Sequence, residues 1–352
     1  MVQLRRLLFV AFVAAIGLPE NLAAQSTPEA DLTTPPEECL VVDEFSVRAG
    51  DAPHDVAPAP DGRVWYTAQG AATLGLLDPA SGEIERFALG TGSAPHGVIT
   101  GPDGVGWVTD GGLNAIVRVD PTTGEVETFP LPGDNANLNT ATFDGDGLLW
   151  FTGQAGIVGW LDPATGELDV ASAPEGVGPY GITTTPSGEV YFVSLAGSYL
   201  GRIAVSGEGA ARTFEIEVIE PATPDQGARR VWSDSAGNLW ISEWLAGQVG
   251  RFDPATGEWT EWPLPGDAAQ AYAVYVDERD DVWLSDFGAD SLVRFDPDTE
   301  EFVSLPLPDA GGNVRQIHGR PGEVWAPESA ADTLLRITSS CEGGAHDDVP
   351  TS

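Results

Sequence analysis

Seven segments of the 352-residue chain share one repeating pattern. In each segment an alternating apolar stretch and a tight turn precede an aromatic anchor, and further short strands separated by turns follow it. The anchors are spaced 41 to 49 residues apart, at Trp65, Trp107, Trp150, Tyr191, Trp240, Trp283 and Trp325. Four strands per unit of about 40–45 residues are typical of a β-propeller, and period-2 alternation excludes helical solenoids of similar repeat length. We therefore predict an all-β fold, a seven-bladed β-propeller of four-stranded blades.

The start of the chain differs from the repeats. Arg5 and Arg6 precede an apolar run over residues 7–18, and the small pair Ala23-Ala24 follows it. This is the order of a secretory signal peptide, although the arginine pair also permits a twin-arginine signal. We assign residues 1–24 to the signal peptide, 25–38 to a linker, 39–341 to the propeller and 342–352 to a flexible tail. The mature protein is expected to be exported, to the periplasm or the medium, without membrane insertion.

The sequence also predicts how the ring of blades closes. The last repeat, residues 312–338, has three strands, and residues 41–47 resemble the fourth strand of the other repeats. We expect this N-terminal strand to complete the seventh blade, which leaves no open sheet edge. The two cysteines, Cys39 and Cys341, flank these two strands. In an oxidising compartment we expect them to form a disulfide.

The charge of the chain limits its partners. It has 54 acidic and 16 basic residues, all of the latter arginine, for a net charge of −38. A polyanion of this kind is repelled by phosphate backbones and anionic lipid, so nucleic acid and membrane surfaces are poor partners. Adaptation to a saline solvent explains the charge without a partner, and like-charge repulsion favours a monomer. A hydrophobic fraction of 42% with eleven tryptophans suffices for a folded core.

Two sets of residues are expected at one mouth of the propeller channel. Counting back from each anchor gives a first ring on the channel-lining strands: His54, His96, Asn139, Tyr180, Arg229, Tyr272 and Arg315. Three residues after each anchor lies a second ring: Ala68, Asp110, Gly153, Ser194, Glu243, Asp286 and Glu328. Imidazoles near carboxylates could form a metal site or a general-base site. The alternative is a wet channel mouth whose polar groups are satisfied by water and by one another. Trp244 adjoins Glu243 and could stack on a substrate.

Two repeats resemble those of a known enzyme family. The second, Ala94-Pro95-His96-Gly97-Val98 followed by a turn and the stretch ending at Asp110, is similar to the repeat of the virginiamycin B lyase (streptogramin lyase) family. The fifth repeat, residues 238–252, resembles it as well, and the resemblance spans roughly residues 41–338. It implies a seven-bladed propeller that linearises cyclic depsipeptide antibiotics by elimination across an ester bond, with a magnesium ion and a histidine base. The metal would stabilise charge on the carbonyl side while the histidine removes the α proton.

The family's active residues carry over only in part. In chain order, Tyr272 stands at the family's first histidine, Asn313-Val314-Arg315 at its Glu-Pro-His triplet, and Glu328 at its second glutamate. Arginine cannot act as a base at ordinary pH. A register rotated by two blades puts His54 and His96 in the histidine slots and Asp110 near the acidic slot, but Ala94 then replaces the triplet's glutamate. The ligand set is incomplete in both registers.

Three functional interpretations follow. The first is a carbon–oxygen lyase acting on a cyclic ester, with His96 as base and His54 assisting. Its metal, magnesium by resemblance, would be held by Asp110, Glu243, Asp286 and Glu328. Its substrate-binding residues would be Asn139, Tyr180, Arg229, Tyr272, Arg315 and Trp244. The second is a non-enzymatic propeller that binds a small-molecule, peptide-like or protein ligand at the mouth. The third is a metal-dependent lactonase resembling the gluconolactonase and regucalcin propellers. Those propellers have six blades, so the seven repeats of this chain disfavour this interpretation.

Overall fold

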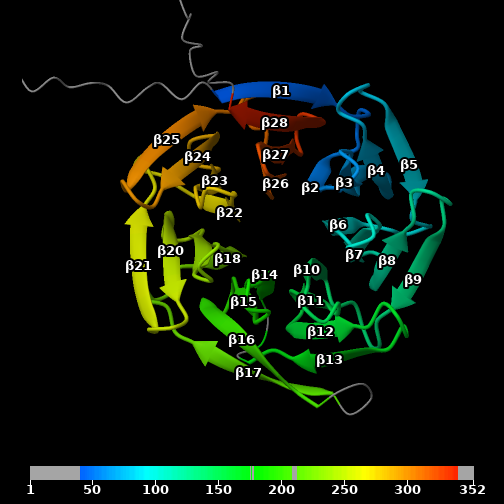
Figure 1. Cartoon of the computed structure of the whole chain (residues 1–352), viewed down its shortest axis with the longest axis horizontal. Helices are drawn as coiled ribbons and strands as arrows, with labels where there is room; N and C mark the ends of the chain where they lie inside the picture. The colour runs from blue at the N-terminus through cyan, green and yellow to red at the C-terminus, as the bar shows by residue number, and fades with distance from the viewer. Residues whose placement is uncertain (1–39, 175, 177, 208–211, 340–352) are drawn as a thin grey trace, which may run out of the picture. The chain divides into compact units, whose positions relative to one another are not determined.

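The computed structural model describes residues 40–174, 176, 178–207 and 212–339. Within these residues 28 strands form seven four-stranded antiparallel sheets, with one short 3-10 turn, η1 (Gln69–Ala71). Figure 1 shows the seven sheets as the blades of a ring, each with its first strand innermost. The predicted seven-bladed β-propeller is therefore confirmed. In the described part of the chain, no helix is long and apolar enough to cross a membrane.

The blades follow one another along the chain, and each is numbered here from its innermost strand outward. Blade one is β2 (Pro53–Pro58), β3 (Val64–Ala68), β4 (Thr73–Leu77) and β5 (Ile84–Ala88). Blade two is β6 (Pro95–Thr100), β7 (Gly106–Asp110), β8 (Ala115–Val119) and β9 (Val126–Pro130). Blade three is β10 (Leu138–Phe143), β11 (Leu149–Gly153), β12 (Ile157–Leu161) and β13 (Leu168–Ser172). Blade four is β14 (Pro179–Thr184), β15 (Val190–Ser194), β16 (Tyr199–Ser206) and β17 (Thr213–Ile219). Blade five is β18 (Ala228–Ser233), β19 (Leu239–Glu243), β20 (Gln248–Asp253) and β21 (Glu258–Pro263). Blade six is β22 (Ala271–Val276), β23 (Val282–Asp286), β24 (Ser291–Asp296), β25 (Glu301–Pro306).

The seventh blade joins the two ends of the described chain. It consists of β26 (His318–Arg320), β27 (Glu323–Glu328), β28 (Thr333–Ser339) and, outermost, β1 (Leu40–Ser46). β1 runs antiparallel to β28 from Leu40 opposite Ser339 to Ser46 opposite Thr333, as Figure 1 shows for the blue and red strands. The predicted closure by the N-terminal strand is confirmed. Cys39, Cys341, the signal peptide, the linker and the tail lie outside the described residues.

The anchors form the core between neighbouring blades. All seven lie in second strands and are at most 4% exposed. Trp65, for example, packs with Leu74 of its own blade and with Val98 and Val108 of the next. The indole nitrogens of Trp240 and Trp283 donate to aspartate oxygens of the preceding turn, at 3.0 and 2.9 Å. These anchors are thus apolar bodies with one satisfied polar atom, which suits a tryptophan between two blades.

A hydroxyl two residues after the anchor links adjacent blades near the channel. Thr67 Oγ1 accepts from the Asp55 amide at 3.0 Å and donates to the His96 carbonyl of the next blade at 2.9 Å. Ser242 repeats this between the Arg230 amide and the Tyr272 carbonyl. At these points the pairing of the innermost and second strands is irregular in six blades. Such bulges re-aim side chains and are common beside functional sites.

Candidate functional site

The first ring occupies equivalent positions in all seven blades. In blades one to six each member is the second residue of the innermost strand. In blade seven Arg315 follows Val314, which bridges to Glu328 as Pro53 does to Ala68 in blade one. Every ring member except Arg315 contacts another member: the centroids of His54 and His96 are 4.0 Å apart, for example, and the Tyr180 and Tyr272 hydroxyls are 2.6 Å apart. The structure therefore brings the predicted residues together at one layer of the channel.

A buried ion pair lies next to this ring and was missed by the sequence analysis. Asp55 Oδ1 is 2.7 Å from His54 Nδ1 and 3.0 Å from a terminal nitrogen of Arg230. Asp55 is 1% exposed and Arg230 5%. Arg230 comes from blade five and Asp55 from blade one, so the pair spans the channel.

A signal for this pair exists in the sequence. The residues that directly follow the seven ring members are Asp55, Gly97, Thr140, Gly181, Arg230, Ala273 and Gln316. The two charged members have opposite sign and all others are neutral. Charges of opposite sign at one channel layer are expected to pair, because an unpaired buried charge is costly.

The two imidazoles of the site are neutral near pH 7. Burial, and then the positive charges of Arg230, Arg315 and Arg229, hold the pKa of His54 well below its usual value. Burial, and then the neighbouring His54, do the same to the pKa of His96, against the opposing charge of Asp55. The contact between His54 and Asp55 is therefore a hydrogen bond to a neutral ring.

His96 is the more accessible of the two rings, since it is partly exposed whereas His54 is buried. Its Nδ1 lies 3.1 Å from the Asn139 carbonyl, which assigns the proton to that nitrogen. Nε2 is 3.4 Å from the Asn139 side-chain nitrogen, a long and weak contact. The lone pair of Nε2 is thus the available basic site.

Aromatic side chains surround Arg229. Its guanidinium carbon lies 3.6 Å from the ring centroid of Tyr272 and 4.8 Å from those of Tyr180 and Trp244. One terminal nitrogen donates to the Tyr180 hydroxyl at 3.2 Å. Burial, and then the charge of Tyr180, raise the pKa of Tyr272 to about 12, so its hydroxyl stays protonated. Trp244, predicted to stack on a substrate, makes edge contacts with Tyr272 and Phe287. Its role in substrate binding stays a prediction.

The four predicted metal-ligating carboxylates end the second strands of four different blades. Asp110 Oδ1 accepts from the amides of Ala94 and Gly112 at 2.9 and 3.0 Å. Asp286 Oδ1 accepts in the same way from two loop amides, each at 2.8 Å. Glu243 accepts from Gln248 Nε2 at 2.6 Å, and burial raises its pKa to about 8. Glu328 is fully buried, and burial raises its pKa to about 7.

The cluster of potential metal ligands beside the first ring does not fit a magnesium ion. Among the described residues, one group of histidine, cysteine and acidic side chains offers three ligand atoms within 4.8 Å of one another: His54, Asp55 and His96. Magnesium demands octahedral oxygen ligation, and this group supplies one carboxylate that Arg230 already binds. Three guanidinium groups also surround it and would repel a divalent cation. A shared role of the four second-ring carboxylates as metal ligands stays a prediction.

Two hollows adjoin the ring. One of about 350 Å³ continues along the innermost strands beyond Asp55 and Arg230, with Trp232, Gln316 and His318 in its walls. Burial lowers the pKa of His318 to about 4. The other, of about 430 Å³, lies on the rim beside Trp244, where Leu245 is 67% exposed.

Comparison with known proteins identifies the family to which the chain belongs. A sequence model of the virginiamycin B lyase family matches residues 37–222, more than half of the chain. The chain belongs to the virginiamycin B lyase family. No curated protein matches it.

Solved lyases share the fold of this virginiamycin B lyase family member. Virginiamycin B lyase from Staphylococcus aureus has 21% identity and a TM-score of 0.78, over 85% of this chain and 99% of that one. A streptogramin B lyase has 23% identity and a TM-score of 0.77, over 85% and 98% of the two chains. The catalytically inactive histidine-to-alanine variant of the Staphylococcus aureus enzyme, with quinupristin, has 22% identity and a TM-score of 0.77, over 85% and 99%. At this identity the likeness establishes the fold.

Proposed function

We propose that this protein is an exported carbon–oxygen lyase that opens a cyclic ester by elimination, with His96 as the base. The observation that carries the proposal is the state of His96: a partly exposed, neutral imidazole whose Nδ1 is fixed by the Asn139 carbonyl. Membership of the family supports the reaction type. The solved variant of the Staphylococcus aureus enzyme supports the importance of a histidine, since a histidine-to-alanine change inactivates that protein.

In this mechanism Nε2 of His96 takes the proton α to a substrate carbonyl. The electron pair of the broken C–H bond forms a C=C bond, and the C–O bond breaks with its pair on the leaving carboxylate. Asp55 lies close enough that its negative charge favours the imidazolium formed on His96. Asp55 also accepts from His54, which holds the second imidazole in one tautomer beside the base. No step requires a metal ion.

The test is mass spectrometry of the mature protein incubated with a B-type streptogramin, with magnesium and separately with a chelator. We expect a ring-opened product of unchanged mass under both conditions, lost in His96→Ala. His318→Ala is the matched control, because His318 lies in the channel hollow and contacts Trp232 and Tyr275 rather than the ring. Activity that survives in His96→Ala discards the assigned base. A product heavier by one water indicates the lactonase-like hydrolase instead.

A second candidate function is non-enzymatic binding, favoured by the enclosure of Arg229 among Tyr180, Tyr272 and Trp244. Aromatic rings and a guanidinium in a largely buried mouth suit recognition of a planar or anionic ligand. Calorimetric titration with the same antibiotic distinguishes the two. Saturable binding without turnover in the wild type favours the binding module, and binding followed by ring opening favours the lyase.

A further inference from the structure

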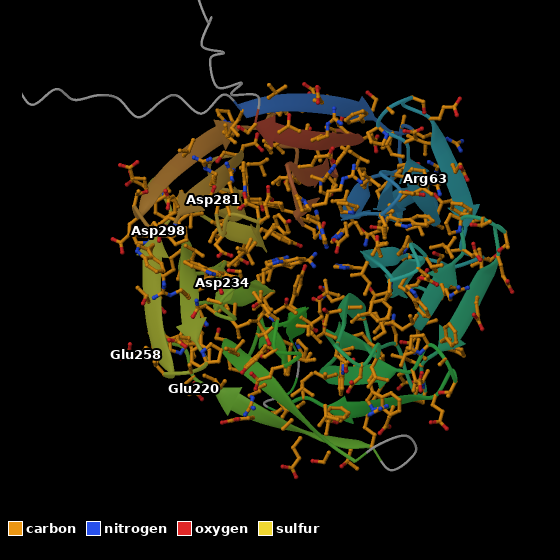
Figure 2. All side chains as sticks on the ribbon, viewed as in Figure 1. Arg63, Glu220, Asp234, Glu258, Asp281 and Asp298 are labelled. Carbon is orange, nitrogen blue, oxygen red and sulfur yellow. The ribbon has the colours of Figure 1, made fainter. Side chains whose placement is uncertain are left out.

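The arginines of the mouth contrast with the rest of the molecule. The chain is strongly acidic, and Figure 2 shows the acidic residues Glu258 and Asp298 at the outer edge of the ring. Several arginines away from the channel pair with carboxylates, such as Arg86 with Asp51 and Arg336 with Asp43 at 2.6 Å. Arg229, Arg230 and Arg315, in contrast, occupy the channel layer itself.

Two of these three charges are not neutralised. Arg230 pairs with Asp55. Across the described residues, no carboxylate lies within salt-bridge distance, 4.0 Å, of Arg229 or Arg315. Arg229 is held by aromatic faces and the Tyr180 hydroxyl, and the buried Nε of Arg315 has no hydrogen-bond partner among these residues. Arg229 and Arg315 are both partly buried in one channel layer. In a protein with more than three acidic residues for each basic one, two such cations without a carboxylate leave that layer open to an anionic ligand.

The two cations belong to the same channel layer as the imidazole pair. Both add to the positive field that disfavours protonation of His54. In ring order they flank Tyr272, whose hydroxyl bonds to that of Tyr180. The channel layer that holds the base thus also holds two guanidinium groups and two phenol hydroxyls. All of these are hydrogen-bond donors, which is the composition of a carboxylate site.

We propose that Arg229 and Arg315 form a carboxylate-binding site at the mouth of this propeller. The inference rests on the proposed function and deepens it: the carboxylate is the group released when the C–O bond breaks. The guanidinium groups would stabilise the charge on that leaving oxygen, a role for which a positioned cation is effective in an enclosed site. The proposed site would bind an anion at the mouth, whereas the family resemblance implies a metal cation there.

Acetate titration, followed by NMR of the imidazole resonances of His54 and His96, tests this without any substrate. Acetamide is the matched neutral probe. We expect saturable shifts with acetate and none with acetamide. Arg315→Gln should weaken acetate binding about tenfold, because one charge-assisted hydrogen bond is lost, and Arg315→Lys should restore part of it. Arg251→Gln is the control, since Arg251 lies over Trp240 and Trp262 in the body of blade five.

Three results would overturn the carboxylate site: no saturable shift with acetate, equal shifts with acetate and acetamide, or equal weakening in Arg251→Gln. Thermal unfolding of Arg315→Gln checks that the variant is folded; if it is not, the Arg315→Lys titration decides. Failure of the lyase proposal is distinguishable, because acetate binding can persist in a protein that opens no ester.

Discussion

Asp55 and Arg230 are 175 positions apart in sequence, yet their side chains form a buried ion pair at 3.0 Å across the channel. The pair joins the innermost strands of blades one and five, β2 and β18. It also sets the electrostatics of the mouth, because Asp55 accepts from His54 while Arg230 lowers the pKa of that histidine. Burial raises the pKa of Asp55, and Arg230 opposes this. Each charge therefore depends on the other.

Removing one partner of this pair should be more costly than removing both. Arg230→Met leaves Asp55 buried without its counter-charge, and we expect a loss of about 3–5 kcal/mol in the free energy of unfolding. The double variant Asp55→Asn/Arg230→Met should lose less than Arg230→Met alone, and clearly less than the sum of the single variants. Urea unfolding of the four proteins measures this coupling. Additive losses would show that the two side chains do not interact.

The pKa of Glu243 predicts a stability that falls with rising pH. Its folded value is about 8 against an ordinary 4.5, so between these values the native state holds a proton that the unfolded chain has lost. Stability then decreases as pH rises through this window and levels off above about pH 8, for a total on the order of 5 kcal/mol.

Glu243→Gln tests this, since glutamine cannot titrate and its oxygen can still accept from Gln248. The stability difference between variant and wild type should grow in favour of the variant from pH 5 to pH 8. Glu328 contributes a similar dependence to both proteins and cancels. A difference that is constant over this range would contradict the prediction.

A disulfide between Cys39 and Cys341 is the third prediction. The last described pair of the closing strands is Leu40 opposite Ser339. In the sequence, Cys39 directly precedes Leu40, and Cys341 comes two residues after Ser339. Intact mass of the mature protein after thiol alkylation should show no modified cysteine without reductant and two with it. In the chain-entropy model, closing a loop of about 300 residues stabilises by about 5 kcal/mol. Alkylation of the unreduced, denatured protein at both cysteines would refute the bridge.

Gly181 should not tolerate a side chain. A Cβ at this position would lie 2.7 Å from the Cα of Arg230, because the innermost strands of blades four and five approach closely there. Gly181→Ala is expected to cost about 1–3 kcal/mol through forced backbone shifts. Gly145→Ala is the control, as its Cβ would meet nothing within 4 Å. Equal thermal stability of the two variants would mean that the blades can separate without cost.

The periodic sequence alone determined the fold. Strand alternation, turn residues and the spacing of the anchors are local properties, and each repeat carries its own copy of them. Counting from the anchors therefore placed His54, His96 and four further ring residues on the innermost strands, and Arg315 beside a bridge residue of blade seven. The three-stranded last repeat predicted that β1 completes it. Because the pattern recurs in seven repeats, each repeat independently indicates the same spacing between its anchor and its ring residue.

Only the tertiary structure decided what those residues contact. Asp55 and Arg230 meet because ring closure brings distant blades face to face, a relationship that no local pattern contains. The same holds for the carboxylates: Asp110 and Asp286 each accept from amides of their own loops, contacts that the spacing of the second ring does not contain. The net charge at the mouth is the total of the charged side chains that all seven blades contribute. It depends on which groups are buried together rather than on the composition of any one repeat.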